Sequence, residues 1–497
     1  MVKKLPEDCL DQIFRYLVEN ACSLYSCLLV NKQWASVAVP ILWTNPWKYE
    51  KPFKDDVDET FWPLIIKAVY ACFSLETKDL LKKNGLDLLL QGCTSAMFDY
   101  VRYCQHLSPE IIDQLTHERT FNEQRGDLYR PFRDQLVEQE LYKLFMSRSS
   151  LRHLVLPKIP LSYCPGFGLC LQKLRELVCR SDQPVDLFYG LAQICKSIQG
   201  IIVDPCIDDN AGLAALIEFQ SNLKYLEIHA PEVRAVECTL IGKAIMSQAH
   251  SLIYVHFQGF LCIHPSTLAS LSNLKTLKLF MSGHITNIQQ FASSKFPNLE
   301  VLDIFWDEHT PFDIFTMLIQ NTKGSLKRIY WNTDCPPRNS EDIRVYLNIL
   351  THNTFSKLTF ATVWWTEEVD REFEKFLKTC SNLQALKVCS FPLDGIPQSI
   401  TRLLQILSKN APKELNVLDI DGDWILTPDH LANFLESWRK KPRLSLFISP
   451  KITLSDEHRH LINIYRDEGV LKHFQGAEFL DEVDCLKDIF DLWLPSS

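Results

Sequence analysis

The stretch "NLKYLEI" at residues 222–228 is followed by three others of the same form: "SLIYVHF" at 251–257, "NLKTLKL" at 273–279 and "NLEVLDI" at 298–304. All four fit the template L-x-x-L-x-L, with other large apolar residues replacing some leucines. Such a short apolar alternation predicts a β-strand, because successive side chains of a strand point to opposite faces. One strand pattern recurring at a near-constant spacing predicts an array of stacked repeats.

The same template recurs from residue 150 onward, and most gaps between matches are about 22 to 32 residues, at or just above the range of leucine-rich repeats. Amphipathic stretches with helical spacing, such as "DIFTMLIQNT" and "REFEKFLKTC", lie between the matches. Strand, turn, helix and return form the unit of an α/β solenoid (a horseshoe), in which each repeat completes its core against its neighbours. The first leucines of the nine clearest matches are Leu151, Leu174, Leu223, Leu252, Leu274, Leu299, Leu326, Leu383 and Leu415.

Residues between the strand leucines are predicted to point to the opposite, concave side of the array. Many are aromatic or charged, and aromatic residues and arginine are enriched at binding hot spots. We expect a target protein to bind there through Tyr225, His229, Tyr254, His256, Lys278, Phe280, Asp303, Phe305, Arg328, Tyr330, Phe360 and Trp364. The same alternation places Glu227, Gln258, Thr276, Val301, Asn332 and Thr362 on this side.

The N-terminal segment predicts three short helices. Pro6 suits a first helical position, and Asn31 is a suitable cap for the third helix, which Pro40 is expected to end. A unit of about 40 residues cannot enclose this many large apolar side chains. Part of this surface must therefore pack elsewhere, either on the rest of this chain or on a partner.

This segment resembles an F-box. "LPEDCLDQIF" at residues 5–14 and "LVNKQWASVAVPILW" at residues 29–43 carry its Leu-Pro opening, its Ile-Phe pair, its Leu-Val-Asn-Lys-x-Trp block and its closing Pro-x-Leu-Trp. The resemblance implies binding to the Skp-type adaptor of an SCF (Skp-cullin-F-box) ubiquitin ligase, and through it to a cullin. It also implies that a set of residues faces the adaptor or holds that face together: Leu5, Pro6, Ile13, Phe14, Leu17, Val30 and Trp34.

The fold class is thus α/β, with a three-helix F-box at 1–47, a helical connector at 48–148, a leucine-rich-repeat solenoid at 149–450 and a helical C-terminal cap at 451–497. Charged helical patterns mark the last segment, because a repeat array needs an atypical end to cover its final apolar face. The cap residues are predicted to be Phe479, Leu486, Ile489, Phe490 and Trp493.

Composition excludes several classes of partner. The net charge is −9 without a long basic run, which disfavours nucleic acid and anionic membrane surfaces. The most apolar stretch, "FWPLIIKAVYACF", is too short to span a bilayer, and no signal peptide is expected. The 17 cysteines show no C-x-x-C spacing, so we expect reduced thiols in the cytoplasm or nucleus.

Catalytic and metal-binding motifs are not expected either. The sequence contains neither a phosphate-binding G-x-x-x-x-G-K-[ST] loop nor a G-x-S-x-G elbow, and "HRH" at 458–460 is predicted to be solvated surface. We therefore expect no cofactor and no metal site. An enzymatic role would depend on scattered histidines and cysteines that a fold brought together.

The sequence favours a non-catalytic subunit that recognises a target protein for ubiquitination and proteasomal degradation. An alternative from a different class is an interaction scaffold that uses its F-box for assembly without directing degradation. The sequence does not separate these two functions, and it does not identify the target.

Overall fold

The computed structural model describes residues 5–49, 61–86, 96–120, 130–231, 236–282, 288–306, 312–331, 337–352, 355–390 and 397–476. The chain divides into two compact units, Met1–Lys224 and Tyr225–Ser497. The predicted cap residues from Phe479 to Trp493 lie outside the described residues. Among the described residues, no helix combines the length and the apolar composition that crossing a membrane requires.

The first unit begins with three short helices whose N-termini are set by local sequence. Helix α1 (Glu7–Arg15) follows Pro6, which occupies the cap position, one residue earlier than expected. The side chain of Asn31 accepts a hydrogen bond from the backbone N–H of Trp34, so the predicted cap of α3 (Lys32–Leu42) is confirmed. The prediction that Pro40 ends α3 is wrong, because Pro40 lies inside the helix two residues before its end. Its missing N–H removes only one backbone bond there, and its carbonyl accepts a bond from the Thr44 hydroxyl at 2.9 Å.

The rest of the first unit is helical at first and then takes up the repeat pattern. The predicted helical connector contains four α-helices, α4 to α7, between Phe61 and Arg148, and a short strand, β1 (His106–Leu107), that the sequence did not indicate. Strands β1 to β4 pair in parallel and in chain order. The elements are α2 (Ala21–Leu28), η1 (Pro46–Tyr49), α4 (Phe61–Ala71), α5 (Leu75–Lys83), η4 (Tyr100–Tyr103), β1 (His106–Leu107), α6 (Pro109–Thr120), α7 (Arg130–Arg148), β2 (His153–Val155), η5 (Leu161–Tyr163), α8 (Phe167–Cys170), β3 (Glu176–Cys179), α9 (Val185–Ile194), β4 (Gly200–Val203) and α10 (Ala211–Glu218).

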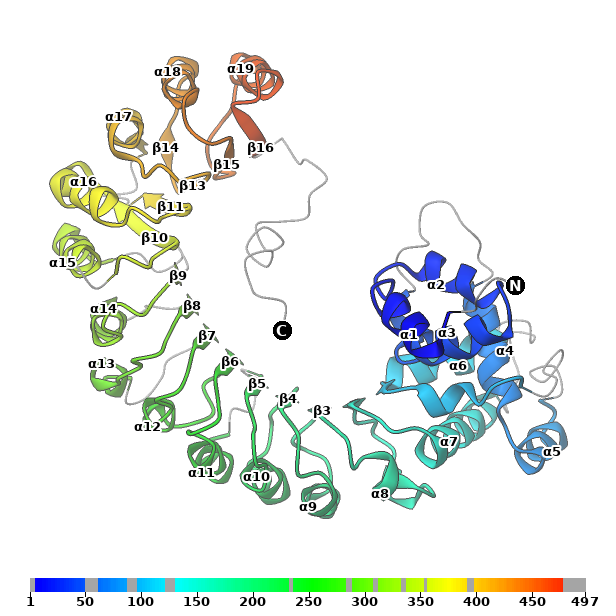
Figure 1. Ribbon diagram of the computed structural model, residues 1–497. Coiled ribbons are helices and arrows are strands. Elements are labelled where there is room, and N and C mark those ends of the chain that lie inside the picture. Colours follow the sequence, from blue (N-terminus) through cyan, green and yellow to red (C-terminus); the bar gives the residue numbers. More distant parts are fainter. Residues whose placement is uncertain are drawn as a thin grey trace. The chain divides into compact units, whose positions relative to one another are not determined.

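The second unit is an α/β solenoid, as the repeat predicts. Its main strands pair in parallel in chain order, and its helices lie on the outer side of the strands (Figure 1). The elements are β5 (Tyr225–Ala230), α11 (Thr239–Ser247), β6 (Tyr254–Gly259), α12 (Pro265–Ala269), β7 (Thr276–Met281), α13 (Gln290–Ser293), β8 (Val301–Trp306), α14 (Phe312–Asn321), β9 (Arg328–Trp331), α15 (Ser340–Thr351), β10 (Phe360–Trp365), η6 (Glu367–Val369), α16 (Asp370–Thr379), β11 (Ala385–Ser390), α17 (Thr401–Asn410), β13 (Val417–Asp421), α18 (Pro428–Trp438), β15 (Leu444–Ile448), α19 (Asp456–Asp467) and β16 (Leu471–Gln475), with a small separate pair β12 (Gln398–Ser399) and β14 (Trp424–Ile425).

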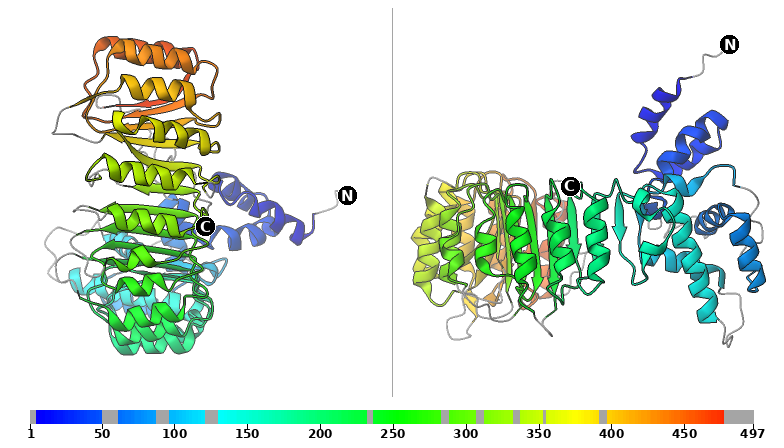
Figure 2. Two further views of the ribbon diagram at one scale, coloured as in Figure 1. Left: turned by 90° about the vertical axis from the view of Figure 1, so that its left-hand side faces the viewer. Right: turned by 90° about the horizontal axis from the view of Figure 1, so that it is seen from below.

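The repeat leucines form the core. All nine predicted first leucines are fully buried. Strands β5 and β7 alternate between buried and half-buried residues along their whole length, so one face packs under the helices and the other is the inner face of the unit. The helices of this unit stack side by side against the buried face (Figure 2). Each repeat thus buries its apolar face against its neighbours.

The C-terminal part of the described chain differs from the prediction in two places. Residues Leu471–Gln475 form strand β16, which pairs in parallel with β15, instead of continuing a charged helix. His458 of the "HRH" motif is buried, and its Nδ1 accepts a bond from the Ser455 backbone N–H at 3.0 Å, so it caps α19 and is not solvated. Burial lowers the pKa of His458, while neighbouring backbone groups oppose this effect.

Candidate adaptor-binding and target-binding surfaces

Two predicted adaptor-binding residues hold the N-terminal helices together. The Phe14 side chain is 1% exposed, and its ring lies 5.3 Å from the ring of Trp34, centroid to centroid. This pair packs α1 against α3. Gln33 adds a hydrogen bond from its side-chain amide to the Leu5 carbonyl at 3.1 Å. Phe14 therefore supports the surface of this module and does not form it.

Two tryptophans anchor the module to the connector. Trp43 and Trp47 are 5% and 8% exposed, and the Trp47 indole N–H donates to the carbonyl of His106 at 3.0 Å. The Trp43 ring lies 4.7 Å from that of Tyr100, and the Trp47 ring lies 6.4 Å from that of Phe145. Part of the apolar surface of the first 48 residues thus packs on this chain itself.

Another part of that apolar surface stays in solvent. Leu5, Ile13 and Val30 are 48%, 47% and 54% exposed, Pro6 is exposed and Leu17 is half-buried. The sequence did not single out Tyr16 and Leu29, which are 91% and 74% exposed. Both lie just after a helix end, outside the helical stripe used to select residues. Exposed apolar side chains gathered in one small module are typical of an interaction site.

On the inner face of the second unit, the parallel register places equivalent residues in rows across the strands. Glu227 of β5 lies opposite His256 of β6, His256 lies opposite Lys278 of β7, and Lys278 lies opposite Asp303 of β8. The row continues with Tyr330 on β9, and Lys387 on β11 lies opposite Asp419 on β13. Two neighbouring pairs in this row carry charges of opposite sign, Lys278 with Asp303 and Lys387 with Asp419, and we call it the polar row.

An ion pair joins Asp303, near the centre of the polar row, to Arg328, which lies opposite Val301 in the neighbouring row. Asp303 is 2% exposed, and its carboxylate accepts a hydrogen bond from Arg328 Nε at 3.0 Å. Burial raises the pKa of Asp303, and the Arg328 guanidinium opposes this increase. The same guanidinium lies 5.3 Å from the ring centroid of Phe360 and 5.9 Å from that of Tyr330. Arg328 therefore connects the charged and aromatic parts of the face.

A second buried charge group lies further along the row. Lys387 Nζ is 3.5 Å from a carboxylate oxygen of Asp419 and 3.0 Å from one of Asp421. Burial lowers the pKa of Lys387, but the two carboxylates outweigh this effect and hold it above its usual value. Burial raises the pKa of Asp419 to about 6, although Lys387 opposes the increase. None of these three residues was predicted as a site residue. The signal for Lys387 and Asp419 was the same L-x-x-L-x-L alternation, in "NLQALKV" and "ELNVLDI".

The predicted target-binding residues fall into three groups by exposure. Phe305 is exposed, and most others are half-buried: Tyr225, His229, Tyr254, His256, Lys278, Phe280, Arg328 and Tyr330. Asp303 and Phe360 are buried. Phe360 belongs to an apolar cluster with Ala385 and Val417 of its own row and with Phe447 of the next row.

The expected exposure of Trp364 is wrong. Its side chain is fully buried, and its ring lies 5.3 Å from those of both Trp331 and Phe312. Tyr346 of α15 lies 6.2 Å away. All six residues of β10 are buried, so the simple alternation that holds in β5 and β7 does not predict exposure there.

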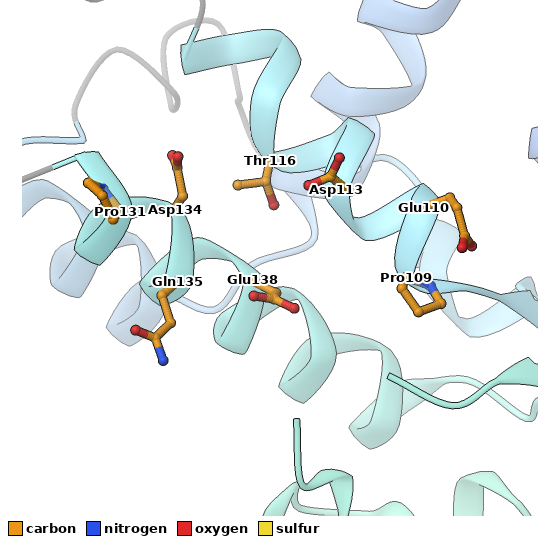
Figure 3. A pocket seen from close by; sticks show the side chains of 8 residues that line it. All are labelled: Pro109, Glu110, Asp113, Thr116, Pro131, Asp134, Gln135 and Glu138. Atoms are coloured by element: carbon orange, nitrogen blue, oxygen red, sulfur yellow. The ribbon is translucent and has the colours of Figure 1, made fainter. Parts of the chain in front are cut away.

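A separate pocket lies between α6 and α7 of the first unit (Figure 3). Four of its lining residues are acidic: Glu110, Asp113, Asp134 and Glu138. Burial raises the pKa of Glu138, and the charge of Asp113 adds to this effect. None of the lining residues belongs to either candidate surface.

Comparison with known proteins supports the interpretation of the N-terminal module. Residues 2–48 match the family model described as F-box-like, so the chain carries an F-box-like domain at its N-terminal end. A search of curated protein sequences finds no match.

Among solved structures, one similar chain comes from the crystal structure of the Rad7 and Elc1 complex in yeast. It is 12% identical, with a TM-score of 0.41, over 94% of this chain and 91% of that one. Another is a Bacteroides fragilis protein from a structural genomics programme. It is 13% identical, with a TM-score of 0.30, over 57% of this chain and 78% of that one.

Proposed function

We propose that this protein is the target-recognition subunit of an SCF-type ubiquitin ligase. The observation that carries the proposal is the F-box-like domain whose Leu5, Ile13 and Val30 side chains stay exposed while Trp43 and Trp47 are anchored to the connector. An adaptor of the Skp type would cover the exposed side chains, and burial of their apolar area would supply binding free energy. That adaptor would connect the chain to a cullin.

The target protein would bind on the inner face of the second unit. Half-buried aromatic residues beside ion pairs offer both apolar contact and charge complementarity, and Phe305 is the most exposed of the predicted residues. Holding the target and the ligase on one chain would raise their effective concentration relative to each other. Other subunits would perform ubiquitin transfer, in the cytoplasm or nucleus, and the target would pass to the proteasome.

Binding to a purified Skp-type adaptor tests the first half of the proposal. Ile13→Asp combined with Val30→Asp should weaken binding by about 100-fold or more, because an unpaired charge would be buried at an apolar contact. Val30 is preferable to Trp34 as the second position, because Trp34 packs on Phe14 and its loss would also weaken the core.

The matched control is Leu75→Asp. Leu75 is 81% exposed on α5, outside the F-box-like domain, so the same chemical change there should leave adaptor binding unaltered. If the adaptor does not bind the wild-type chain, or binds the double variant equally well, the proposal is wrong.

Degradation and scaffolding are separated by what happens to a bound partner. A partner captured by the wild-type chain, and lost with Phe305→Asp, should accumulate in cells when cullin activity is blocked. A partner whose abundance does not change under this block would favour the scaffold function.

A further inference from the structure

Three metal-ligating side chains meet at one end of the polar row, although the sequence showed no metal-binding motif. Glu227 and His229 are two residues apart on β5, so their side chains lie on the same face. His256 occupies the position opposite Glu227 on β6. Two neighbouring strands therefore supply one carboxylate and two imidazoles to the same place.

The distances between these groups suit a common ion. One carboxylate oxygen of Glu227, Oε2, lies 3.4 Å from His229 Nε2 and 3.6 Å from His256 Nδ1, and the three donor atoms all lie within 4.8 Å of one another. Zinc binds imidazole nitrogen and carboxylate oxygen at about 2.0–2.2 Å, which places tetrahedral ligand atoms about 3.3–3.6 Å apart. Two of the separations are thus close to this requirement.

The carboxylate is held from its other side. The second oxygen of Glu227, Oε1, accepts hydrogen bonds from the Tyr225 hydroxyl at 2.6 Å and from the Tyr254 hydroxyl at 3.3 Å. The two tyrosine rings stack, with centroids 4.0 Å apart and planes 8° apart. Partners of this kind orient a ligating carboxylate and leave its other oxygen, Oε2, directed at the two imidazoles.

The imidazoles are held by packing. The His256 ring lies 5.6 Å from the ring of His229 and 4.9 Å from that of Phe280. The side chains of Glu227, His229 and His256 are 14%, 24% and 11% exposed, so the site is sheltered but can be reached from the inner face. Lys278, the next residue in the row, has its ammonium 5.8 Å from the Tyr254 ring centroid.

A second set of the same residue types provides an internal comparison. His106, His153 and Glu176 lie opposite one another on β1, β2 and β3. The rings of His106 and His153 stack at 5.4 Å, and His153 pairs with Glu176 at 3.0 Å. Within the described part of the chain, however, this set is not among the groups whose three ligand atoms lie within 4.8 Å of one another. Composition alone therefore does not create the arrangement at Glu227.

We propose that Glu227, His229 and His256 form a binding site for a transition-metal ion with the ligand preference of Zn²⁺. Two imidazoles and one carboxylate are a known three-residue set for zinc, and they leave a fourth position for water or for a donor atom of a bound molecule. Because the three side chains lie on the inner face of the strands, that position would be open to a molecule bound on this face. The site joins β5 to β6 through side chains, in addition to their backbone ladder.

Zinc titration of the purified full-length chain tests the site. The chain is first stripped with a chelator under reducing conditions, and Zn²⁺ is then added in competition with a chromophoric chelator. Because the 17 cysteines can also bind zinc, the informative quantity is the difference between wild type and variants. His229→Gln and His256→Gln should each lose one bound Zn²⁺ or weaken its binding by about 100-fold or more, and Tyr225→Phe should weaken it about 10-fold, as expected for loss of an orienting partner.

The matched control is His153→Gln, which removes a histidine from the other set and should leave zinc binding unaltered. Circular dichroism of the zinc-free variants establishes that they are folded, and the two histidine variants serve as replacements for each other if one is not. Equal zinc stoichiometry and affinity in wild type and folded variants would overturn the proposal. Adaptor binding through Ile13 is a separate measurement, so failure of the zinc site and failure of the proposed function are distinguishable.

Discussion

The two candidate surfaces are built from opposite kinds of side chain. The F-box-like domain exposes apolar residues such as Ile13 and Val30, and its ion pair of Arg15 with Asp11 lies on the exposed surface. The inner face of the second unit keeps most of its aromatic residues half-buried and matches its charges internally, as in the pair of Asp303 with Arg328. The chain thus leaves apolar side chains exposed on the F-box-like domain, whereas charged groups on the inner face of the second unit have partners within the chain.

This difference predicts different binding behaviour. Covering an exposed apolar side chain is favourable almost regardless of the detailed geometry, at roughly 25 cal/mol per Å² of area removed from water. A face whose charges already have partners gains little unless an incoming group matches or replaces those partners. We therefore expect the F-box-like domain to supply affinity for a constant partner, and the inner face to supply discrimination among targets.

The largest expected effect compares the supporting and exposed positions of α1. Phe14→Ala should destabilise the protein by about 3–5 kcal/mol, because it leaves a cavity beside Trp34. Ile13→Ala should change the free energy of unfolding by less than about 0.5 kcal/mol, because Ile13 is exposed. Urea denaturation followed by tryptophan fluorescence measures both. Similar losses for the two variants would mean that Ile13 is a core residue and not part of a binding surface.

The next effect concerns the charges of the inner face. Lys387→Met should destabilise the protein by about 3 kcal/mol, because it leaves Asp419 and Asp421 without their cation. This destabilisation is at the lower end of the range for a broken buried ion pair, because Asp419 can bind a proton and so lose its unpaired charge. Lys327→Met removes a lysine that pairs with Glu300 at 2.8 Å on the exposed surface, and it should cost less than about 1 kcal/mol. If both lysine variants unfold at the same urea concentration, the ion pairs of Lys387 with Asp419 and Asp421 do not stabilise the inner face as proposed.

A smaller effect is the coupling between Asp303 and Arg328. A double-mutant cycle with Asp303→Asn and Arg328→Met should give an interaction energy of about 1–2 kcal/mol, because the two groups share a sheltered hydrogen bond between opposite charges. The cycle is read from urea unfolding of the wild type, both single variants and the double variant. Additive effects would show that the two side chains act independently.

The smallest effect is a dependence on pH. The pKa of Asp419 is about 6 in the folded chain and lower when unfolded, so between these values the folded state binds more protons than the unfolded state. The contribution of Asp419 to stability must therefore fall as the pH rises from about 4 to about 6. Asp419→Asn removes this contribution, so the variant should gain stability relative to wild type across that range. Thermal melts at several pH values measure the difference, and a constant difference would contradict the assignment.

The sequence predicts a structural feature well when residues close along the chain determine it, and poorly when residues that are close only in space determine it. The repeat leucines, such as Leu226 and Leu277, were predictable because a buried strand face follows from alternation alone. The helix cap at Asn31 was also predictable, because its hydrogen-bond donor, the Trp34 backbone N–H, lies only three residues away along the chain. The effect of Pro40 was misjudged because a proline near a helix end removes one backbone N–H hydrogen bond, and the last two residues of α3 can still follow it. Trp364 was misjudged because its burial depends on Phe312 and Tyr346, which lie on separate helices.

The candidate sites follow the same rule. Exposure within the F-box-like domain could not be derived from the helical stripe, because Tyr16 and Leu29 lie beyond the helix ends. The cluster of Glu227, His229 and His256 was within reach of the sequence. The strand β5 carries Glu-x-His at 227–229, and the next repeat has His256 at the position of Glu227. A parallel register between the two strands is then enough to bring the three side chains together.

The matched charges of the polar row also bear on how quickly a target would be found. Opposite charges a few ångströms apart largely cancel at distances beyond a Debye length, about 8 Å at physiological ionic strength. A face of this kind exerts little long-range electrostatic pull, so we expect encounter rates near about 10⁵–10⁶ M⁻¹s⁻¹, the range for association without steering. Added salt should then change the association rate constant only slightly, and differences among targets should lie mainly in how long each complex persists.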